Sequence, residues 1–175
     1  VKEEVQAIKR MPAAFDHNFA KRLNGTYIKQ AATRWEMMEQ LREDIRNFKA
    51  ANNCERIAVL WAASTEIYVP LCKEHESLAA LEEAMKANNT EVISPSMCYA
   101  YAAIAEGAPF IMGAPNLCVD TPAMWEFSKK MNVPISGKDF KSGQTLMKTV
   151  LAPMFKTRML GVSGWFSSNI LGNRD

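Results

Sequence analysis

Two lysines in the last quarter of the chain have the type and spacing of residues that stabilise negative charge during catalysis. Lys141 and Lys148 are seven residues apart, so a helix places them about 20° from each other at ~100° per residue, with Thr145 between them. Apolar residues at spacings of three and four predict that this helix packs through the roughly opposite face, formed by Met147, Val150, Leu151 and Met154. The lysines are then free to serve a pocket, or they are an ordinary pair of surface lysines.

The loop before this helix has the composition of an anion site. Ser142 and Gly143 lie where the helix begins, and the first N–H groups of a helix have no partner within it, so they favour an anion. Gly143 has no side chain and lets a ligand approach the backbone closely. Asp139 adds an acceptor suited to a ribose hydroxyl, an ammonium group or a cation.

Apolar segments on both sides of the helix predict the strands that would position it. Val133 and Ile135 begin one strand, and residues 160–166 form a second apolar segment. A polar loop at 168–175 follows that second segment. Strand, loop, helix, strand and loop make a βαβ unit, and its two loops emerge where the strands end.

Further strands and helices precede this unit. Arg56–Trp61 is apolar without alternation, as expected for a parallel strand covered on both faces, and it runs into a small, hydroxyl-rich loop at 62–66. Gly107–Asn116 is another strand with its loop. Helices are predicted at three intervening stretches: 74–87, 94–105 and 121–131. The repeated alternation of strand and helix predicts a doubly wound parallel sheet with polar loops gathered at one edge. Ligands of open α/β sheets bind at that edge, where the strands end.

The first part of the chain has a different pattern. Residues 1–50 read as helical, with a boundary at Pro12, a turn at Asn24–Gly25 and a capping box at Thr33 and Glu36. They form a lead-in that extends to residue 53. Residues 54–175 are then one continuous α/β domain.

Composition and missing motifs exclude several classes of function. The net charge of +2 gives no reason to expect a nucleic-acid or membrane surface, and no apolar run has the length of a membrane span. The four cysteines are isolated and read as reduced residues in or near the core of a cytoplasmic protein: Cys54, Cys72, Cys98 and Cys118. Neither histidine has the spacing of a zinc ligand. There is also no P-loop, no Gly-x-Ser-x-Gly elbow and no GxGxxG after a strand. These patterns by themselves indicate an α/β protein that binds an anionic ligand, and nothing more specific.

Four stretches carry a more specific resemblance. Leu60–Tyr68, Glu106–Pro109, Gly137–Thr145 and Ser168–Asp175 resemble, in order and spacing, the signature blocks of the myo-inositol-1-phosphate synthase family. The resemblance implies a partial Rossmann-like doubly wound sheet, with the first nucleotide-binding strand and the oligomerisation sheet outside this chain. It also implies an NAD-dependent isomerase that converts glucose 6-phosphate to inositol phosphate by oxidation, enolisation, ring closure and reduction.

The resemblance also implies roles for individual residues. Lys141 and Lys148 would be catalytic, one stabilising an oxyanion and the other transferring a proton, with their assignment open. Ser64, Thr65, Asp139 and Ser142 would contact NAD. The substrate pocket would be lined by residues of the two later blocks: Thr145, Asn169, Gly172, Asn173 and Asp175. A monovalent or divalent cation could assist, and the protein would form a homo-oligomer through parts outside this chain.

Some positions depart from the family's pattern. Lys138 stands where the family often has an acidic residue, and Glu106 and Ala108 replace an asparagine and a serine. In the last block the polar residues Asn173 and Asp175 are kept, but Arg174 stands between them. Because the family's glycine loop and further catalytic lysines would lie outside the chain, we expect it to be an internal portion of a larger polypeptide that is inactive by itself. Two alternatives remain: a dehydrogenase on the same sheet that releases NADH, and a non-catalytic relative.

Overall fold

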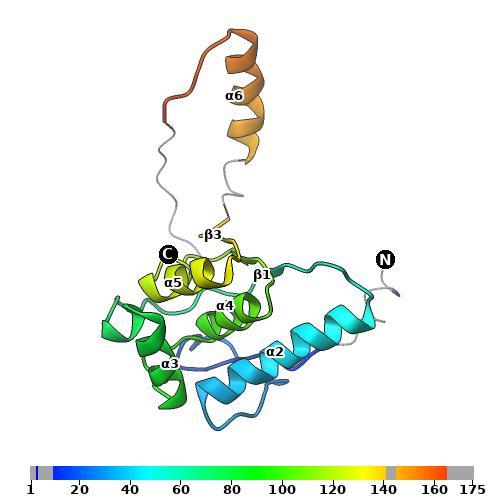
Figure 1. Ribbon diagram of the computed structural model, residues 1–175. Helices are drawn as coiled ribbons and strands as arrows, with labels where there is room; N and C mark the ends of the chain where they lie inside the picture. Colours follow the sequence, from blue (N-terminus) through cyan, green and yellow to red (C-terminus); the bar gives the residue numbers. More distant parts are fainter. Residues whose placement is uncertain (1–2, 4–9, 141–144, 165–175) are drawn as a thin grey trace.

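The computed structural model describes residue 3 and residues 10–140 and 145–164. Three short parallel strands form its sheet in the order β1 (Val59–Trp61), β2 (Phe110–Met112) and β3 (Ile135–Gly137) (Figure 1). Val59 pairs with Phe110 and Phe110 with Ile135, and the same register continues to the end of each strand. The parallel α/β arrangement that the sequence predicts is therefore confirmed.

Helices connect and precede the strands, and most of them start at a hydroxyl residue. The helical elements are α2 (Arg34–Ala51), the 3-10 helix η1 (Lys73–His75), α3 (Leu78–Lys86), α4 (Pro95–Ala105), α5 (Pro122–Met131) and α6 (Thr145–Thr157). The side chains that cap four of them accept a hydrogen bond from the third residue of the helix: Thr33, Ser77, Ser94 and Thr121. Such caps satisfy N–H groups that have no partner within the helix, which is why these helix starts can be predicted locally.

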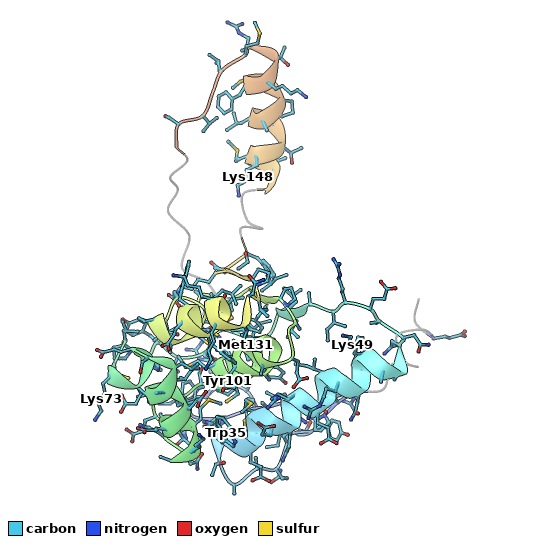
Figure 2. All side chains as sticks on the ribbon, in the orientation of Figure 1. Trp35, Lys49, Lys73, Tyr101, Met131 and Lys148 are labelled. Carbon is cyan, nitrogen blue, oxygen red and sulfur yellow. The ribbon has the colours of Figure 1, made fainter. Side chains whose placement is uncertain are left out.

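Helix α4 lies at the centre of the packed body, between α2, α5 and the sheet (Figure 1). Nearly all of its residues are buried, among them Met97 and Ile104, which have no exposed surface. Tyr101 of this helix contacts Trp35 edge-on at a centroid distance of 5.8 Å and stacks on Phe127 at 4.5 Å. These rings join α4 to α2 and α5, and Figure 2 labels Trp35 and Tyr101 of this group.

Two cysteines lie deep in this core. Cys98 and Cys118 are fully buried and unpaired, as the sequence predicts, and burial raises the pKa of the Cys98 thiol to about 12. Cys54 and Cys72 are half-buried and also free.

The two faces of the sheet differ in burial. Trp61, Phe110 and Met112 are buried in the core cluster with α4. Leu60, which pairs with Ile111 on the other face, is 52% exposed. The expectation that Arg56–Trp61 is covered on both faces is therefore wrong for the residues that the structure describes, and the strand itself is limited to its last three residues.

The lead-in is less helical than predicted. Residues 10–33 contain turns and a single bridge between Ala13 and Ile28, and the helix starts only at Arg34. Pro12 and the Asn24–Gly25 pair disfavour a continuous helix over this stretch.

Helix α6 stands apart from the body (Figure 1). Its predicted packed face is largely exposed: Met147 by 52%, Val150 by 59% and Met154 by 45%. The prediction of a packed stripe is wrong here, because that face meets no covering surface among the described residues. Residues 160–164 form no strand, so the second strand of the predicted βαβ unit is absent from the described part of 160–166.

Candidate functional site

The loops that follow the three strands meet at one edge of the sheet, as the sequence predicts. Gly113 N–H donates to the carbonyl of Trp61 at 3.0 Å, and Phe140 N–H donates to the carbonyl of Gly113 at 3.2 Å. A side chain at Gly113 has no room, because its Cβ would lie 2.5 Å from the Trp61 oxygen and 2.3 Å from the Phe140 ring. Gly113 therefore allows the three loops to come together.

Glu66 and Asn116 join the first two loops through a reciprocal pair of hydrogen bonds. Glu66 N–H donates to Asn116 Oδ1 at 2.9 Å, and Asn116 Nδ2 donates to Glu66 Oε2 at 3.0 Å. Both residues are buried. The amide side chain of Asn116 therefore fixes both the backbone and the side chain of Glu66.

The Glu66 carboxylate also closes the start of α4. Ser96 N–H donates to Oε1 at 3.0 Å, and Ser96 Oγ donates to Oε2 at 2.5 Å. Ser94 Oγ lies 2.9 Å from Ser96 Oγ and continues the chain of hydroxyls. Burial raises the pKa of Glu66, and the bonds from Ser96 offset part of that effect. Because a helix start attracts anions, an internal carboxylate occupies the position that a phosphate could otherwise take on α4.

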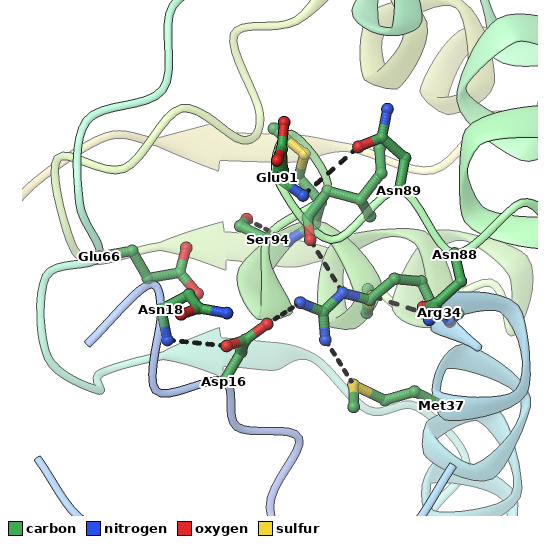
Figure 3. Close-up of polar contacts among 12 residues, drawn as sticks. Asp16, Asn18, Arg34, Met37, Glu66, Asn88, Asn89, Glu91 and Ser94 are labelled. Atoms are coloured by element: carbon green, nitrogen blue, oxygen red, sulfur yellow. Dashed lines mark hydrogen bonds and ion pairs between the residues drawn. The ribbon is translucent and has the colours of Figure 1, made fainter. Parts of the chain in front are cut away.

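Arg34 ties the N-terminal segment to the same region. Figure 3 shows its guanidinium between Asp16 and the backbone near Ser94. Nη2 forms an ion pair with Asp16, and Nε donates to the carbonyl of Ile93 at 3.0 Å. Arg34 is buried, and a buried ion pair of this kind needs the further hydrogen bonds that the Ile93 carbonyl supplies. The segment around Asp16 is thereby held beside the loop after β1, where Ile67 N–H donates to the carbonyl of Phe19 at 2.9 Å.

An ion pair links the second and third loops. Lys138 Nζ lies 2.7 Å from Asp120 Oδ2. Partial burial raises the pKa of Asp120, but the Lys138 ammonium and the Cys118 N–H more than offset this, so the net shift is downward. Lys138, which stands where the resembled family often has an acidic residue, is thus paired with the carboxylate of Asp120 in a neighbouring loop.

A cavity of about 420 Å³ runs along β1 and its loop. Most of its lining is apolar, with Phe19, Tyr99 and Phe110 among the larger residues, and Ser64 and Glu66 are among its few polar groups. Trp61 also lines it, and the Trp61 Nε1 is buried with no hydrogen-bond partner among the described residues. An apolar cavity of this size with a few polar groups has the character of a small-molecule site.

The structure brings some of the predicted site residues to this edge. Ser64 is exposed and Thr65 half-buried in the loop after β1. Asp139 is half-buried in the loop after β3, with a left-handed backbone (φ 66°). The backbone links through Gly113 join these two loops, so the three residues belong to the same edge.

Lys148 is not brought there. It is exposed on α6, away from the body (Figure 2), and lines a shallow groove with Leu151, Phe155 and residues 160 and 162. It therefore shares a side of the helix with Leu151, which the predicted wheel had placed opposite it. Thr145 begins α6. The remaining predicted residues lie outside the described ranges and stay predictions: Lys141, Ser142, Asn169, Gly172, Asn173 and Asp175.

Sequence reasoning missed the Glu66–Asn116 pair. Both residues follow strands and lie at the predicted edge, which was the available signal. Their partners are 30 to 50 positions away along the chain, so no local pattern reveals the contact.

Within the described residues 3, 10–140 and 145–164, no cluster of three or more His, Cys, Asp or Glu side chains could hold a metal ion. In the same ranges no helix combines the length and apolar character that crossing a bilayer requires.

Comparisons with known proteins agree on one family. A family model described as "Myo-inositol-1-phosphate synthase", which bears the name of an NAD-binding domain, matches residues 1–166. The chain is 86% identical over 175 residues to "Inositol-3-phosphate synthase 1" of Bacteroides thetaiotaomicron, covering all of this chain and 41% of that protein. It is 39% identical over 171 residues to "Inositol-3-phosphate synthase" of Trypanosoma brucei brucei, covering 94% of this chain and 32% of that protein.

A solved structure gives the same result for the fold. The crystal structure of inositol-3-phosphate synthase from Caenorhabditis elegans matches with a TM-score of 0.73 and 29% identity, over 85% of this chain and 30% of that one. The chain thus spans well under half the length of the relatives it matches. With most of its length matched by the family model and its entire length aligned to a relative of 86% identity, the chain belongs to the myo-inositol-1-phosphate synthase family.

Proposed function

We propose that the whole protein containing this chain converts glucose 6-phosphate to 1D-myo-inositol 3-phosphate with NAD, for inositol and phospholipid biosynthesis. The observation that carries this proposal is the 86% identity to a protein named inositol-3-phosphate synthase, which extends over the complete chain. The gathering of three loops at the carboxyl edge supports it, because cofactors of this fold bind at that edge.

The described residues fit part of the cofactor. The cavity beside β1 offers apolar walls and the Ser64 hydroxyl, which suit a flat ring with polar substituents or a ribose. They do not fit the pyrophosphate, because Glu66 already occupies the start of α4. Ser64, Thr65 and Asp139 would contact the sugar and ring portions of NAD, and Ser142 is proposed to join them.

The chemistry assigns different tasks to the residues of this chain. NAD would supply the redox chemistry when bound, as the acceptor of a hydride from C5 of the sugar and, as NADH, the donor of that hydride back to the C5 ketone. The C5 ketone makes a proton at C6 removable, and the resulting enolate closes the ring on the C1 aldehyde. A developing negative charge on oxygen needs fixed positive charge nearby, and Lys141 and Lys148 are proposed to supply it and to move the proton.

This role places a condition on α6. Lys148 must lie near the loops after the strands in the whole protein, a position that it does not have here. The substrate phosphate would then lie against the lysines and the helix start at Ser142 and Gly143. Thr145 and the residues of the last block are proposed to line the rest of the pocket: Asn169, Gly172, Asn173 and Asp175.

The decisive experiment follows the whole protein with glucose 6-phosphate and NAD. We expect inositol phosphate to form while no NADH accumulates, because the hydride returns to the product. Accumulating NADH would indicate a dehydrogenase instead. Failure to bind both NAD and hexose phosphate would indicate a non-catalytic relative.

Three further properties belong to the same proposal. Residues 1–175 alone should form no inositol phosphate, and product formation by this segment would contradict that. We also propose a cytoplasmic homo-oligomer, assembled through parts outside this chain, and a monovalent or divalent cation near Asp139. Size-exclusion measurements test the oligomer. Assays with chelators test a divalent cation, and assays in which one monovalent salt replaces another test a monovalent cation.

A further inference from the structure

One buried carboxylate connects three separate segments at the candidate site. Glu66 belongs to the loop after β1, Asn116 to the loop after β2, and Ser96 to the first turn of α4. Both carboxylate oxygens and the Glu66 N–H take part in these contacts. No other carboxylate of the described residues shows hydrogen bonds to both of these partners.

The position of Glu66 in the chain makes these contacts relevant to a ligand. Ser64 and Thr65 directly precede it, and Ser64 shares the cavity beside β1 with it. Since the Glu66 backbone and side chain are both fixed, the two preceding residues have little freedom to move away from the cavity. A loop held in this way can present hydroxyls to a ligand without first being ordered.

A second carboxylate at the opposite end of α4 provides a natural comparison. Glu106 caps the C-terminal end of that helix and accepts from Arg42 Nε at 2.7 Å and from Arg46 Nη1 at 3.0 Å. It also bridges separate segments, but it lies at the other end of α4 from the loops of the candidate site. Removal of this carboxylate should lower the stability of the protein without changing its affinity for a ligand at the carboxyl edge.

We propose that Glu66 is a positioning residue for NAD: by bonding Asn116 and Ser96 it holds Ser64 and Thr65 in the geometry that the cofactor requires. The inference rests on the proposed function, since it assumes that NAD binds at this edge. Glu66 itself need not touch the cofactor or the sugar.

The test uses the whole protein with Glu66→Gln, which keeps the size of the side chain but sets a donor against the donors of Ser96 or Asn116. We expect the KM for NAD to rise about tenfold while kcat changes by less than about threefold, because a misplaced loop weakens binding more than chemistry. Glu106→Gln is the matched control and should leave the KM for NAD unchanged.

A rescue experiment separates positioning from general damage. Asn116→Asp combined with Glu66→Gln restores one amide–carboxylate pair with the two roles exchanged, and it keeps an acceptor for the backbone N–H of residue 66. We expect the double variant to recover part of the KM loss. Should Glu66→Gln fail to fold, Asn116→Ala removes the same link from the other side and should raise the KM for NAD in the same way.

The outcomes are distinct. An unchanged KM for NAD in folded Glu66→Gln, or equal effects of Glu66→Gln and Glu106→Gln, would overturn the positioning role while leaving the proposed function in place. Wild-type protein that binds no NAD would overturn the proposed function. Faster hydrogen exchange at the Glu66 and Ser96 amides in the ligand-free Glu66→Gln variant would support the link between the loops independently of turnover.

Discussion

Helices α4 and α6 are both apolar, yet they have opposite surroundings. Residues of α4 are buried on almost every side by α2, α5 and the sheet. Along α6 the large apolar side chains Leu146, Met147 and Val150 are exposed. An apolar pattern therefore predicts that a helix forms and which face could pack, but the surface that covers that face is a separate requirement.

The same contrast separates stability from chemistry. The body around α4 supplies the buried area and the fixed loops, whereas α6 carries a lysine proposed to act on the substrate. If this division is right, substitutions in the body should change the free energy of unfolding, and substitutions on α6 should change turnover.

Met97→Ala in α4 is expected to have the largest effect. Met97 has no exposed surface, so truncation leaves a cavity and should destabilise the protein by about 2–5 kcal/mol. Met154→Ala on α6 is the matched substitution and, in residues 1–175 alone, should change stability by no more than about 0.5 kcal/mol. Urea unfolding of both variants checks this, and equal losses would show that α6 is packed in solution.

Lys148→Ala tests the chemical half of the comparison. We expect turnover to fall about 100-fold, or ~2.7 kcal/mol in transition-state stabilisation, with NAD affinity unchanged. Lys156→Ala is the control, because Lys156 lines the same groove on α6. Unchanged turnover in Lys148→Ala would remove the catalytic role from this helix.

Asp139→Ala tests whether the loop after β3 belongs to the cofactor side of the site. Loss of an acceptor for a ribose hydroxyl should weaken NAD binding about tenfold, ~1.4 kcal/mol, and weaken sugar phosphate binding less. Calorimetric titration with each ligand measures both affinities. Equal losses would argue against a contact specific to NAD.

The smallest expected effect concerns the pH dependence of stability. Burial raises the pKa of Glu66 above its ordinary value of 4.5, so its contribution to stability is complete below that value and is lost as the pH rises through the raised pKa. The stability of the wild type relative to Glu66→Gln should therefore decline across this window. Unfolding free energies of both proteins at a series of pH values measure the difference, and a difference that grows with pH would contradict the raised pKa.

Local chemistry explains which parts of the fold could be predicted. The starts of α2, α4 and α5 depend on the nearby hydroxyls of Thr33, Ser94 and Thr121, so sequence alone locates them. The strands were located because they are apolar and end in polar loops. These features require only a few neighbouring residues.

The errors arose where distant residues decide. The open face at Leu60 and the exposed stripe of α6 depend on which surfaces meet in space, and periodicity does not encode this. The site was predicted in part for the same reason: the edge and its loops follow from strand order, whereas the Glu66–Asn116 pair joins residues 50 positions apart. Pro12 and Asn24–Gly25 predict a boundary and a turn in residues 10–33, but the non-helical stretch is longer than these two local signals indicate.

The absence of a side chain at Gly113 sets how closely the loops at this edge can approach one another. Even a methyl group there would lie too close to both the Trp61 carbonyl oxygen and the Phe140 ring. The Trp61 carbonyl at the end of β1 and the Phe140 ring after β3 would both have to shift to make room for it. The spacing of the whole edge is therefore set by the middle strand, and a fault at this one position would reach both of its neighbours.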